Sequence, residues 1–218
     1  MSPYPVLLGH RGARGTTSVP ENSLASFDLA LEHGCDGFEF DVRLTADGHG
    51  IICHDPRVQG MEIAQATRAD LSHLCTLHEV LGRYGDRAFL DIELKTAGLD
   101  GVLLTALNVH RPPRFVVSSF LPEVLTSLRV HDASLPLGFI CDVEARLQAW
   151  RSLPVEYVIP HFKLATQKLM EDLRAAGKKT FVWTVNDPSR MSRLMDWGVD
   201  GIISDETGTL VKTVRGRG

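Results

Sequence analysis

The chain has 218 residues, of which 44% are hydrophobic and 23% are charged, and its formal net charge is −4. This length allows one substantial hydrophobic core and is short for two full domains, so we expect residues 1–218 to form a single domain. The negative charge gives no support for nucleic acid or an anionic membrane as a bulk partner, and any phosphate recognition must therefore be local.

The start of the chain, from Met1 to Pro5, has neither the basic region nor the apolar stretch of a secretory signal, and no run reaches membrane-spanning length. We therefore expect a cytoplasmic protein without a stable membrane anchor. The four cysteines lack the paired spacing of a metal site. We expect them to be reduced thiols, mostly buried, because a free cysteine behaves as a small hydrophobic residue.

Apolar runs of strand length alternate with segments of helical periodicity along the whole chain. The expected strands cover residues 6–9, 37–42, 88–94, 115–119, 137–141, 157–160, 180–185 and 201–204. The expected helices cover residues 23–33, 77–84, 100–109, 122–130, 143–150, 166–176, 188–197 and 208–214. Gly34, Gly177 and Gly198 follow three of these helices, where glycine commonly ends a helix.

This alternation predicts a parallel sheet covered by helices, and most simply a closed (β/α)₈ TIM barrel. A doubly wound open sheet is the alternative, and it requires a glycine-rich phosphate turn after the first strand. In such a turn, backbone amides contact the phosphate, but this chain has the basic side chains of His10 and Arg11 there. This weakens the alternative. Residues 45–74 interrupt the alternation with a hairpin turning at Asp47-Gly48 and a polar loop. We expect this insertion after the second strand to lie over the active-site end of the barrel.

Two expected strands carry acids on a face that should be buried. Glu39 and Asp41 are two residues apart, so both leave the same face of the second strand, and Glu93 repeats the pattern on the third. A buried face rarely carries several acids unless a cation compensates their charge. Converging carboxylates of this kind predict a site for a hard divalent cation.

Polar residues gather where the expected strands end, and in a parallel barrel these ends meet on the catalytic face. The residues concerned are His10, Arg11, Glu39, Asp41, Glu93, Lys95, Ser119, Phe120 and Trp183. Each also has a structural interpretation. Glu93 and Lys95 could neutralise one another, Arg11 could be an ion-pair partner, and Asn22 could cap the helix that follows it. Their shared placement at one end is what indicates an active site.

The motifs resemble those of the glycerophosphodiester phosphodiesterase family across nearly the whole chain and in the same order. The matching segments are His10-Arg11-Gly12, Pro20-Glu21-Asn22-Ser23, residues 37–48, His54-Asp55, Ile92-Glu93-Leu94-Lys95, Ser118-Ser119-Phe120, residues 182–186 and residues 198–205. The resemblance implies a TIM barrel of the phospholipase C-like phosphodiesterase type. It also implies metal-dependent hydrolysis of glycerophosphodiesters to sn-glycerol 3-phosphate and an alcohol.

The resemblance implies roles for individual residues. Glu39, Asp41 and Glu93 are expected to bind Ca²⁺ or Mg²⁺, with Mn²⁺ as a further possibility. His10 and His54 are expected as general acid and base, and Arg11 and Lys95 as phosphate contacts. Phe120 and Trp183 are expected to line the substrate pocket, while Glu21 and Asn22 are expected to support the site from behind.

Phosphodiester hydrolysis requires groups of these kinds. Charge builds on the phosphate oxygens and on the leaving alkoxide, and a divalent ion with fixed cations offsets it. An alkoxide leaves with difficulty near neutral pH unless a histidine donates a proton to it, and a second histidine is needed to deprotonate the attacking oxygen. The resemblance therefore implies a small glycerophosphodiester as the substrate.

Three other functions remain open from the sequence. The first is a lysophospholipase D-like or other phosphodiesterase on the same barrel, and the second is a barrel that binds a phosphate ligand without catalysis. The third is a metal-assisted lyase or enolising barrel, which also uses acids at strand ends. The chain departs from the family pattern after His54-Asp55, where the loop is short, and at Ser204-Asp205-Glu206, where a proline commonly follows.

Overall fold

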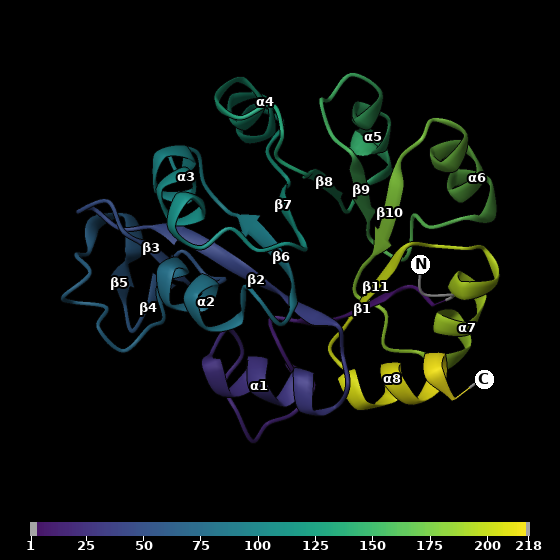
Figure 1. The fold of residues 1–218 in the computed structure, drawn as a ribbon, viewed down its shortest axis with the longest axis horizontal. Coiled ribbons are helices and arrows are strands. Elements are labelled where there is room, and N and C mark those ends of the chain that lie inside the picture. The colour runs from purple at the N-terminus through teal and green to yellow at the C-terminus, as the bar shows by residue number, and fades with distance from the viewer. Residues whose placement is uncertain (1–3, 217–218) are drawn as a thin grey trace.

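The computed structural model describes residues 4–216. Residues 1–3, part of the start of the chain that was searched for a secretory signal, lie outside the described residues. Eight parallel strands form a closed ring (Figure 1). They are β1 (Val6–His10), β2 (Gly37–Leu44), β6 (Phe89–Leu94), β7 (Phe115–Ser119), β8 (Leu137–Cys141), β9 (Tyr157–Pro160), β10 (Lys179–Val182) and β11 (Gly201–Ser204). Strand β1 pairs with both β2 and β11, which closes the barrel and rules out the open sheet.

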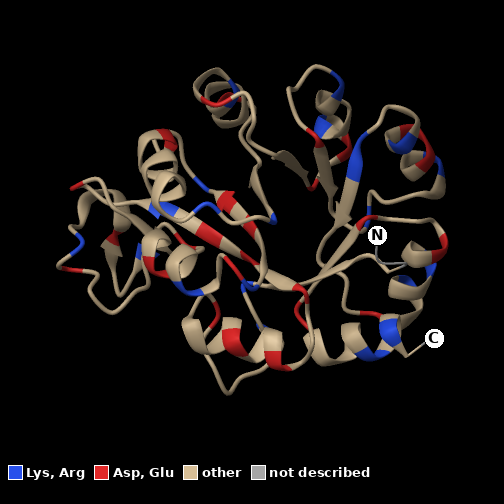
Figure 2. Ribbon diagram, in the orientation of Figure 1, with Lys and Arg blue, Asp and Glu red and all other residues tan. Residues whose placement is uncertain are grey.

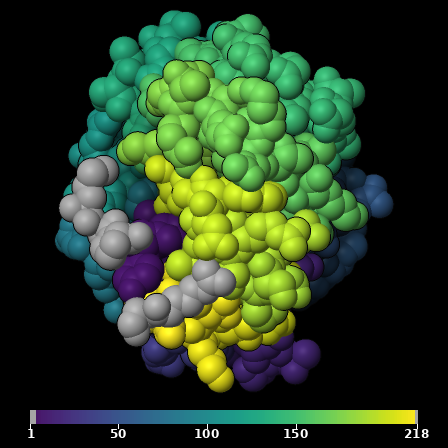
Figure 3. Space-filling view, turned by 90° about the vertical axis from the view of Figure 1, so that its right-hand side faces the viewer, coloured from purple at the N-terminus to yellow at the C-terminus, as the bar shows by residue number. Residues whose placement is uncertain are grey.

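Eight α-helices surround the ring (Figure 1). They are α1 (Leu24–Glu32), α2 (Leu77–Tyr84), α3 (Asp100–Val109), α4 (Pro122–His131), α5 (Glu144–Leu147), α6 (Gln167–Ala175), α7 (Pro188–Asp196) and α8 (Thr207–Arg215). Helices α6 to α8 cover one side of the barrel next to the N-terminal strand, as the green, yellow and purple surfaces of Figure 3 show. The expected (β/α)₈ barrel is confirmed.

The strands alternate between two apolar environments. On β6, Leu90, Ile92 and Leu94 face outward into the large core between strands and helices, while Phe89 faces the barrel interior. The interior core also contains Leu8, Val116, Ile140, Tyr157, Ile159, Phe181 and Ile203. These side chains fill the barrel interior, and Ile140, Ile159 and Ile203 reach the cavity near the carboxyl ends of the strands. Polar groups also collect at this carboxyl end.

Most element bounds agree with the sequence pattern to within a few residues. Strand β2 runs past residue 42 to Leu44, because Arg43 and Leu44 pair with β3 (Gly50–Ile52) in an antiparallel hairpin. Strand β10 ends at Val182, so Trp183 lies just beyond it and not inside a strand. The helix expected over 143–150 is the short α5, continued by the 3-10 helix η2 (Gln148–Arg151). Gly34, Gly177 and Gly198 have positive φ values, as expected of residues that end a helix.

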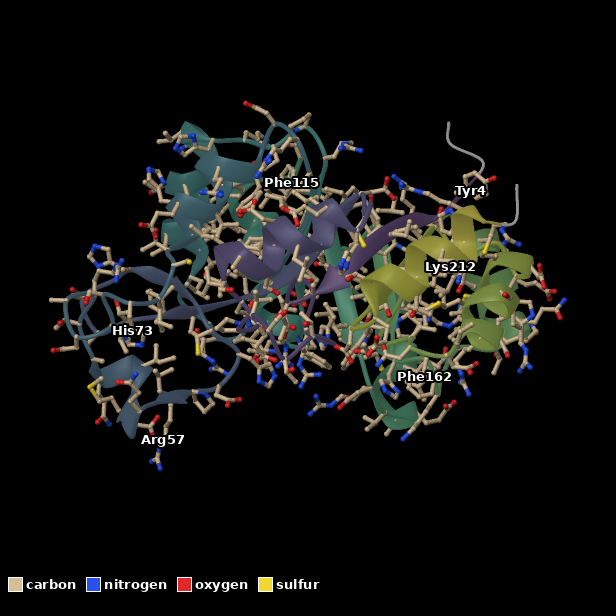
Figure 4. The ribbon with its side chains drawn as sticks, turned by 90° about the horizontal axis from the view of Figure 1, so that it is seen from below. Tyr4, Arg57, His73, Phe115, Phe162 and Lys212 are labelled. Carbon is tan, nitrogen blue, oxygen red and sulfur yellow. The ribbon has the colours of Figure 1, made fainter. Side chains whose placement is uncertain are left out.

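The insertion after β2 has more structure than a polar loop. It contains β4 (Arg57–Val58), β5 (Met61–Glu62) and the 3-10 helix η1 (Ile63–Gln65). Its core of Ile51, Ile63, Ala66 and Leu71 is separate from the barrel cores. Figure 4 shows His73 and Arg57 from this segment beside the barrel, toward the end that carries Phe162.

Within residues 4–216, no helix is both long and apolar enough to cross a membrane. All four cysteines are free thiols; Cys35 and Cys141 are buried, while Cys53 and Cys75 are partly exposed.

Candidate active site

Strand alternation directs four carboxylates into one end of the barrel. On β2, Phe38 and Phe40 face the helices, so Glu39 and Asp41 face the interior. In the parallel pairing with β6, Glu39 lies opposite Asp91 and Asp41 opposite Glu93. The acidic segments of both strands lie side by side in the left-hand wall of the ring (Figure 2).

Three of these acids form a compact oxygen cluster. One carboxylate oxygen from each of Glu39, Asp41 and Glu93 lies within 4.8 Å of the others, and all three residues are buried. Burial raises the pKa of Glu93 to about 8, and burial followed by repulsion from Asp41 raises the pKa of Glu39 well above its usual value. The Oε1 atom of Glu39 has no hydrogen-bond partner within the described residues. An unpartnered buried oxygen among oxygen donors fits a hard cation such as Ca²⁺ or Mg²⁺.

Lys95 compensates part of this acidic charge. Its Nζ atom lies 2.6 Å from Glu93 Oε1 and 3.0 Å from Asp41 Oδ1. Burial alone would lower the pKa of Lys95, but the carboxylates outweigh it and raise the pKa. Glu93 and Lys95 therefore do neutralise one another, as one interpretation of the sequence expected, and Asp41 shares the charge of Lys95.

Arg11 and Asn22 attach the loop after β1 to the acidic strands. Arg11 donates its backbone N–H to Glu39 Oε2 at 3.0 Å, and its side chain lies against Glu21 and Asp41 at 2.8 and 3.3 Å. Asn22 donates from Nδ2 to Asp41 Oδ2 at 2.7 Å. Arg11 and Asn22 both have positive φ, near 52° and 55°, which turns the loop back onto β2.

The alternative interpretation of Asn22 as the cap of helix α1 is not what the structure shows. Ser23 is the cap, because its side chain accepts a hydrogen bond from the backbone N–H of Ser26. This leaves the amide of Asn22 free to hold Asp41. Glu21 lies behind Arg11 and also accepts a hydrogen bond from Arg14.

His10 is held in one orientation by the last strand of the barrel. Its Nδ1 atom lies 2.7 Å from Oδ1 of Asp205, the residue after β11. Although burial acts in the opposite direction, hydrogen bonds from His10 and Asn186 lower the pKa of Asp205 to about 2. The ionised carboxylate therefore fixes the proton on Nδ1 and leaves Nε2, which lies 3.9 Å from Glu39 Oε2, toward the acids.

His54 approaches from the insertion. It lies beyond β3, and the backbone N–H of the preceding Cys53 donates to the carbonyl of Asp41 at 3.0 Å. Its Nδ1 atom lies 2.8 Å from Asp55 Oδ1, and 35% of its side chain is exposed. Burial is the main cause that lowers the pKa of His54, which favours a neutral imidazole near pH 7.

These residues surround one cavity of about 80 Å³. It is lined by His10, Arg11, Glu39, His54, Asp91, Glu93, Lys95, Phe120, Ile140, Ile159, Trp183 and Ile203. Phe120 and Trp183 meet edge to face with ring centroids 5.5 Å apart, and the indole N–H of Trp183 donates to the carbonyl of Ile159. The structure thus brings together the residues to which the resemblance gives roles, with Asp41, Glu21 and Asn22 behind the lining. Ser119 does not line the cavity, and its hydroxyl donates to the carbonyl of Leu94 at 2.8 Å.

Comparison with known proteins identifies the chain's family. The model of the glycerophosphoryl diester phosphodiesterase family matches residues 10–89 and 84–209. The chain belongs to the glycerophosphoryl diester phosphodiesterase family. It is accordingly a member of a family of phosphoric diester hydrolases, and the resemblance found in its motifs is confirmed.

Relatives of the glycerophosphoryl diester phosphodiesterase family match the chain over almost its full length. A glycerophosphodiester phosphodiesterase of Caldanaerobacter subterraneus subsp. tengcongensis is 30% identical, with 96% of this chain and 98% of the relative covered. An Oleispira antarctica phosphodiesterase, solved in complex with the product sn-glycerol 3-phosphate, is 27% identical with a TM-score of 0.85 and 96% of each chain covered. The Thermotoga maritima enzyme is 26% identical with a TM-score of 0.83, covering 96% of this chain and 98% of that one.

Two residues of this family member were missed from the sequence as site residues. Asp205 was noted only as part of a segment that departs from the family pattern, yet it orients His10. Asp91 precedes Glu93 by two residues and therefore shares its face of β6. The same spacing that singled out Glu39 and Asp41 could have identified Asp91.

Proposed function

We propose that this protein hydrolyses glycerophosphodiesters to sn-glycerol 3-phosphate and an alcohol, with residues 1–218 acting as one barrel domain. The proposal rests on family membership and on a single structural observation. An acidic oxygen cluster, two imidazoles and two cationic side chains share one small cavity at the carboxyl end of the strands.

Glu39, Asp41 and Glu93 would hold a divalent cation, Ca²⁺ or Mg²⁺, with Mn²⁺ as a further candidate. Supporting observations are the three converging oxygens and the unpartnered Oε1 of Glu39. When bound, such an ion polarises a phosphoryl oxygen and offsets the charge that develops during substitution, which is worth several kcal/mol. Asn22 would keep the Asp41 carboxylate in place through its hydrogen bond to Oδ2.

His10 and His54 would move the two protons of the reaction. Each has its Nδ1 atom beside a carboxylate, so Nε2 is the atom left to act on the substrate. One imidazole removes the proton of the attacking oxygen, and the other donates a proton to the leaving alkoxide. Each transfer typically contributes on the order of 10² to 10⁴ in rate.

Arg11 and Lys95 would contact the phosphate oxygens, and Phe120 with Trp183 would line the pocket for the organic groups. Both cations already lie against the acids, with 11% of the Arg11 side chain and 12% of the Lys95 side chain exposed. Such preorganised charges stabilise a transition state without having to reorganise during the reaction.

A cation-stripped sample tests this function. Protein treated with EDTA should not release glycerol 3-phosphate from glycerophosphocholine or glycerophosphoethanolamine, as followed with a coupled dehydrogenase. Restoring Ca²⁺, Mg²⁺ or Mn²⁺ should restore release. Full activity in EDTA would remove the cation from the proposal, and no release under any condition would remove the reaction.

A further inference from the structure

A fourth acid lies beside the three already described, opposite Glu39 in the β2–β6 pairing. Asp91 is buried with 1% of its surface exposed, and it faces the barrel interior from β6. It precedes Glu93 by two residues on the same face, which places it about 6–7 Å further along β6 from the barrel mouth than Glu93, given the rise of a parallel strand. Three further residues that line the same cavity, Ile140, Ile159 and Ile203, are apolar and belong to the interior core.

Only one oxygen of Asp91 is used by the protein. The hydroxyl of Ser118 donates to Oδ1 at 2.5 Å, while Oδ2 is buried without a hydrogen-bond partner among the described residues. A buried carboxyl oxygen with no partner costs folding free energy, so native structures rarely contain one without a reason. Since Asp91 lines the cavity, a molecule bound there can supply the missing partner.

The proposed reaction indicates which group of the bound molecule supplies the partner for Oδ2 of Asp91. With the phosphate held between the two histidines, the acids and Arg11, the organic part would contact the apolar residues that line the cavity. A glycerol group carries two hydroxyls beyond its ester oxygen, and these need a polar partner in an apolar pocket. The inference that follows therefore rests on the proposed function.

We propose that Oδ2 of Asp91 hydrogen-bonds a hydroxyl of the substrate's glycerol group and thereby selects glycerol diesters over simple alkyl diesters. The pairing does not depend on the protonation state, because an ionised carboxyl accepts the hydroxyl hydrogen and a protonated one can also donate. A buried polar group that is left unpaired rejects an analogue lacking the matching hydroxyl much more strongly than an apolar wall does.

Two substrates separate this role from general catalysis: sn-glycero-3-phosphocholine and propyl phosphocholine, which lacks both hydroxyls. Choline release gives kcat and KM for each. The wild-type protein should prefer the glycerol diester by at least tenfold in kcat/KM. In Asp91→Leu this preference should fall to within about threefold, and in Asp91→Asn, whose amide can bond both Ser118 and the hydroxyl, it should be largely retained.

Binding provides a second readout that does not depend on turnover. Titration calorimetry with glycerol 3-phosphate and with propyl phosphate should show the same discrimination in the wild type and its loss in Asp91→Leu. Equal cleavage of the two diesters by the wild type would overturn the role of Asp91 while leaving the hydrolase function intact. Cleavage of neither diester would overturn the function itself, and a preference unchanged in Asp91→Leu would show that another residue selects the glycerol group.

Discussion

His10 and Asp205 are 195 positions apart in the chain, and their side chains meet at 2.7 Å. The contact exists because β1 and β11 pair in parallel where the barrel closes, with Gly9 opposite Ser204. An aspartate on Nδ1 fixes the tautomer of an imidazole and stabilises its charged form. Asp205 is therefore a positioning residue for His10.

Replacing this carboxylate should impair proton transfer. We expect Asp205→Asn to lower kcat by on the order of 10²-fold with a smaller change in KM, because the amide no longer fixes the proton on Nδ1 of His10. Asp142→Asn, which changes an exposed aspartate directly after barrel strand β8, is a matched control. Equal kcat values for the Asp205→Asn and wild-type proteins would show that this contact has no part in turnover.

The same contact should make stability depend on pH in a defined direction. The pKa of Asp205 is lowered to about 2 in the folded protein, below its usual value of about 4. The contribution of Asp205 to the free energy of unfolding is thus complete above pH 4 and is lost as the pH falls through about 2. Thermal unfolding of wild type and Asp205→Asn should therefore differ most near pH 6 and converge toward pH 2. A gap that widens on acidification would contradict this assignment.

Both histidines should be needed for turnover. We expect His54→Ala and His10→Gln each to reduce kcat by about 10² to 10⁴, since each removes one proton transfer. His54 is partly exposed, so its removal should leave the melting temperature nearly unchanged. His73→Ala, an exposed histidine of the same insertion, is the control for that segment. Near-normal rates in either active-site variant would exclude that residue from the mechanism.

Asn22 and Ser23 are adjacent in the chain, but we expect substitution of Asn22 to weaken cation binding and substitution of Ser23 to lower stability. Asn22→Gly keeps the positive φ and removes the amide that holds Asp41, so the Kd for Ca²⁺ or Mg²⁺ should rise about 10- to 100-fold. Ser23→Ala removes the cap of α1 and should cost about 1 kcal/mol of unfolding free energy without changing cation binding. Calorimetric titration and thermal unfolding of both variants distinguish these outcomes. Equal cation affinity in the two variants would remove the proposed role of Asn22.

Lys95 should stabilise the cation-free protein. Its loss in Lys95→Met leaves Asp41 and Glu93 close together without their nearest positive charge, at a cost of about 2–4 kcal/mol for a largely buried group. The melting temperature in EDTA should fall by several degrees and recover partly when Ca²⁺ or Mg²⁺ is added. An unchanged melting temperature in EDTA would mean that the acids do not depend on Lys95 for compensation.

Local patterns in the sequence were sufficient for the parts of the site that lie on one strand. Glu39 and Asp41 share a face because side chains alternate, and the same rule places Glu93 and Lys95 together. The contact between His10 and Asp205 depends on barrel closure, which no local pattern specifies. The small core around Ile63 and Leu71 was also missed, because its apolar residues are scattered through a polar segment.

The most direct test of the site is a crystal structure of the protein with Mn²⁺ and glycerol 3-phosphate, with the ion located by anomalous scattering. We expect one peak at bonding distance from carboxylate oxygens of Glu39, Asp41 and Glu93, with the phosphate between the imidazoles of His10 and His54. A peak elsewhere, or a phosphate out of reach of both imidazoles, would contradict the account.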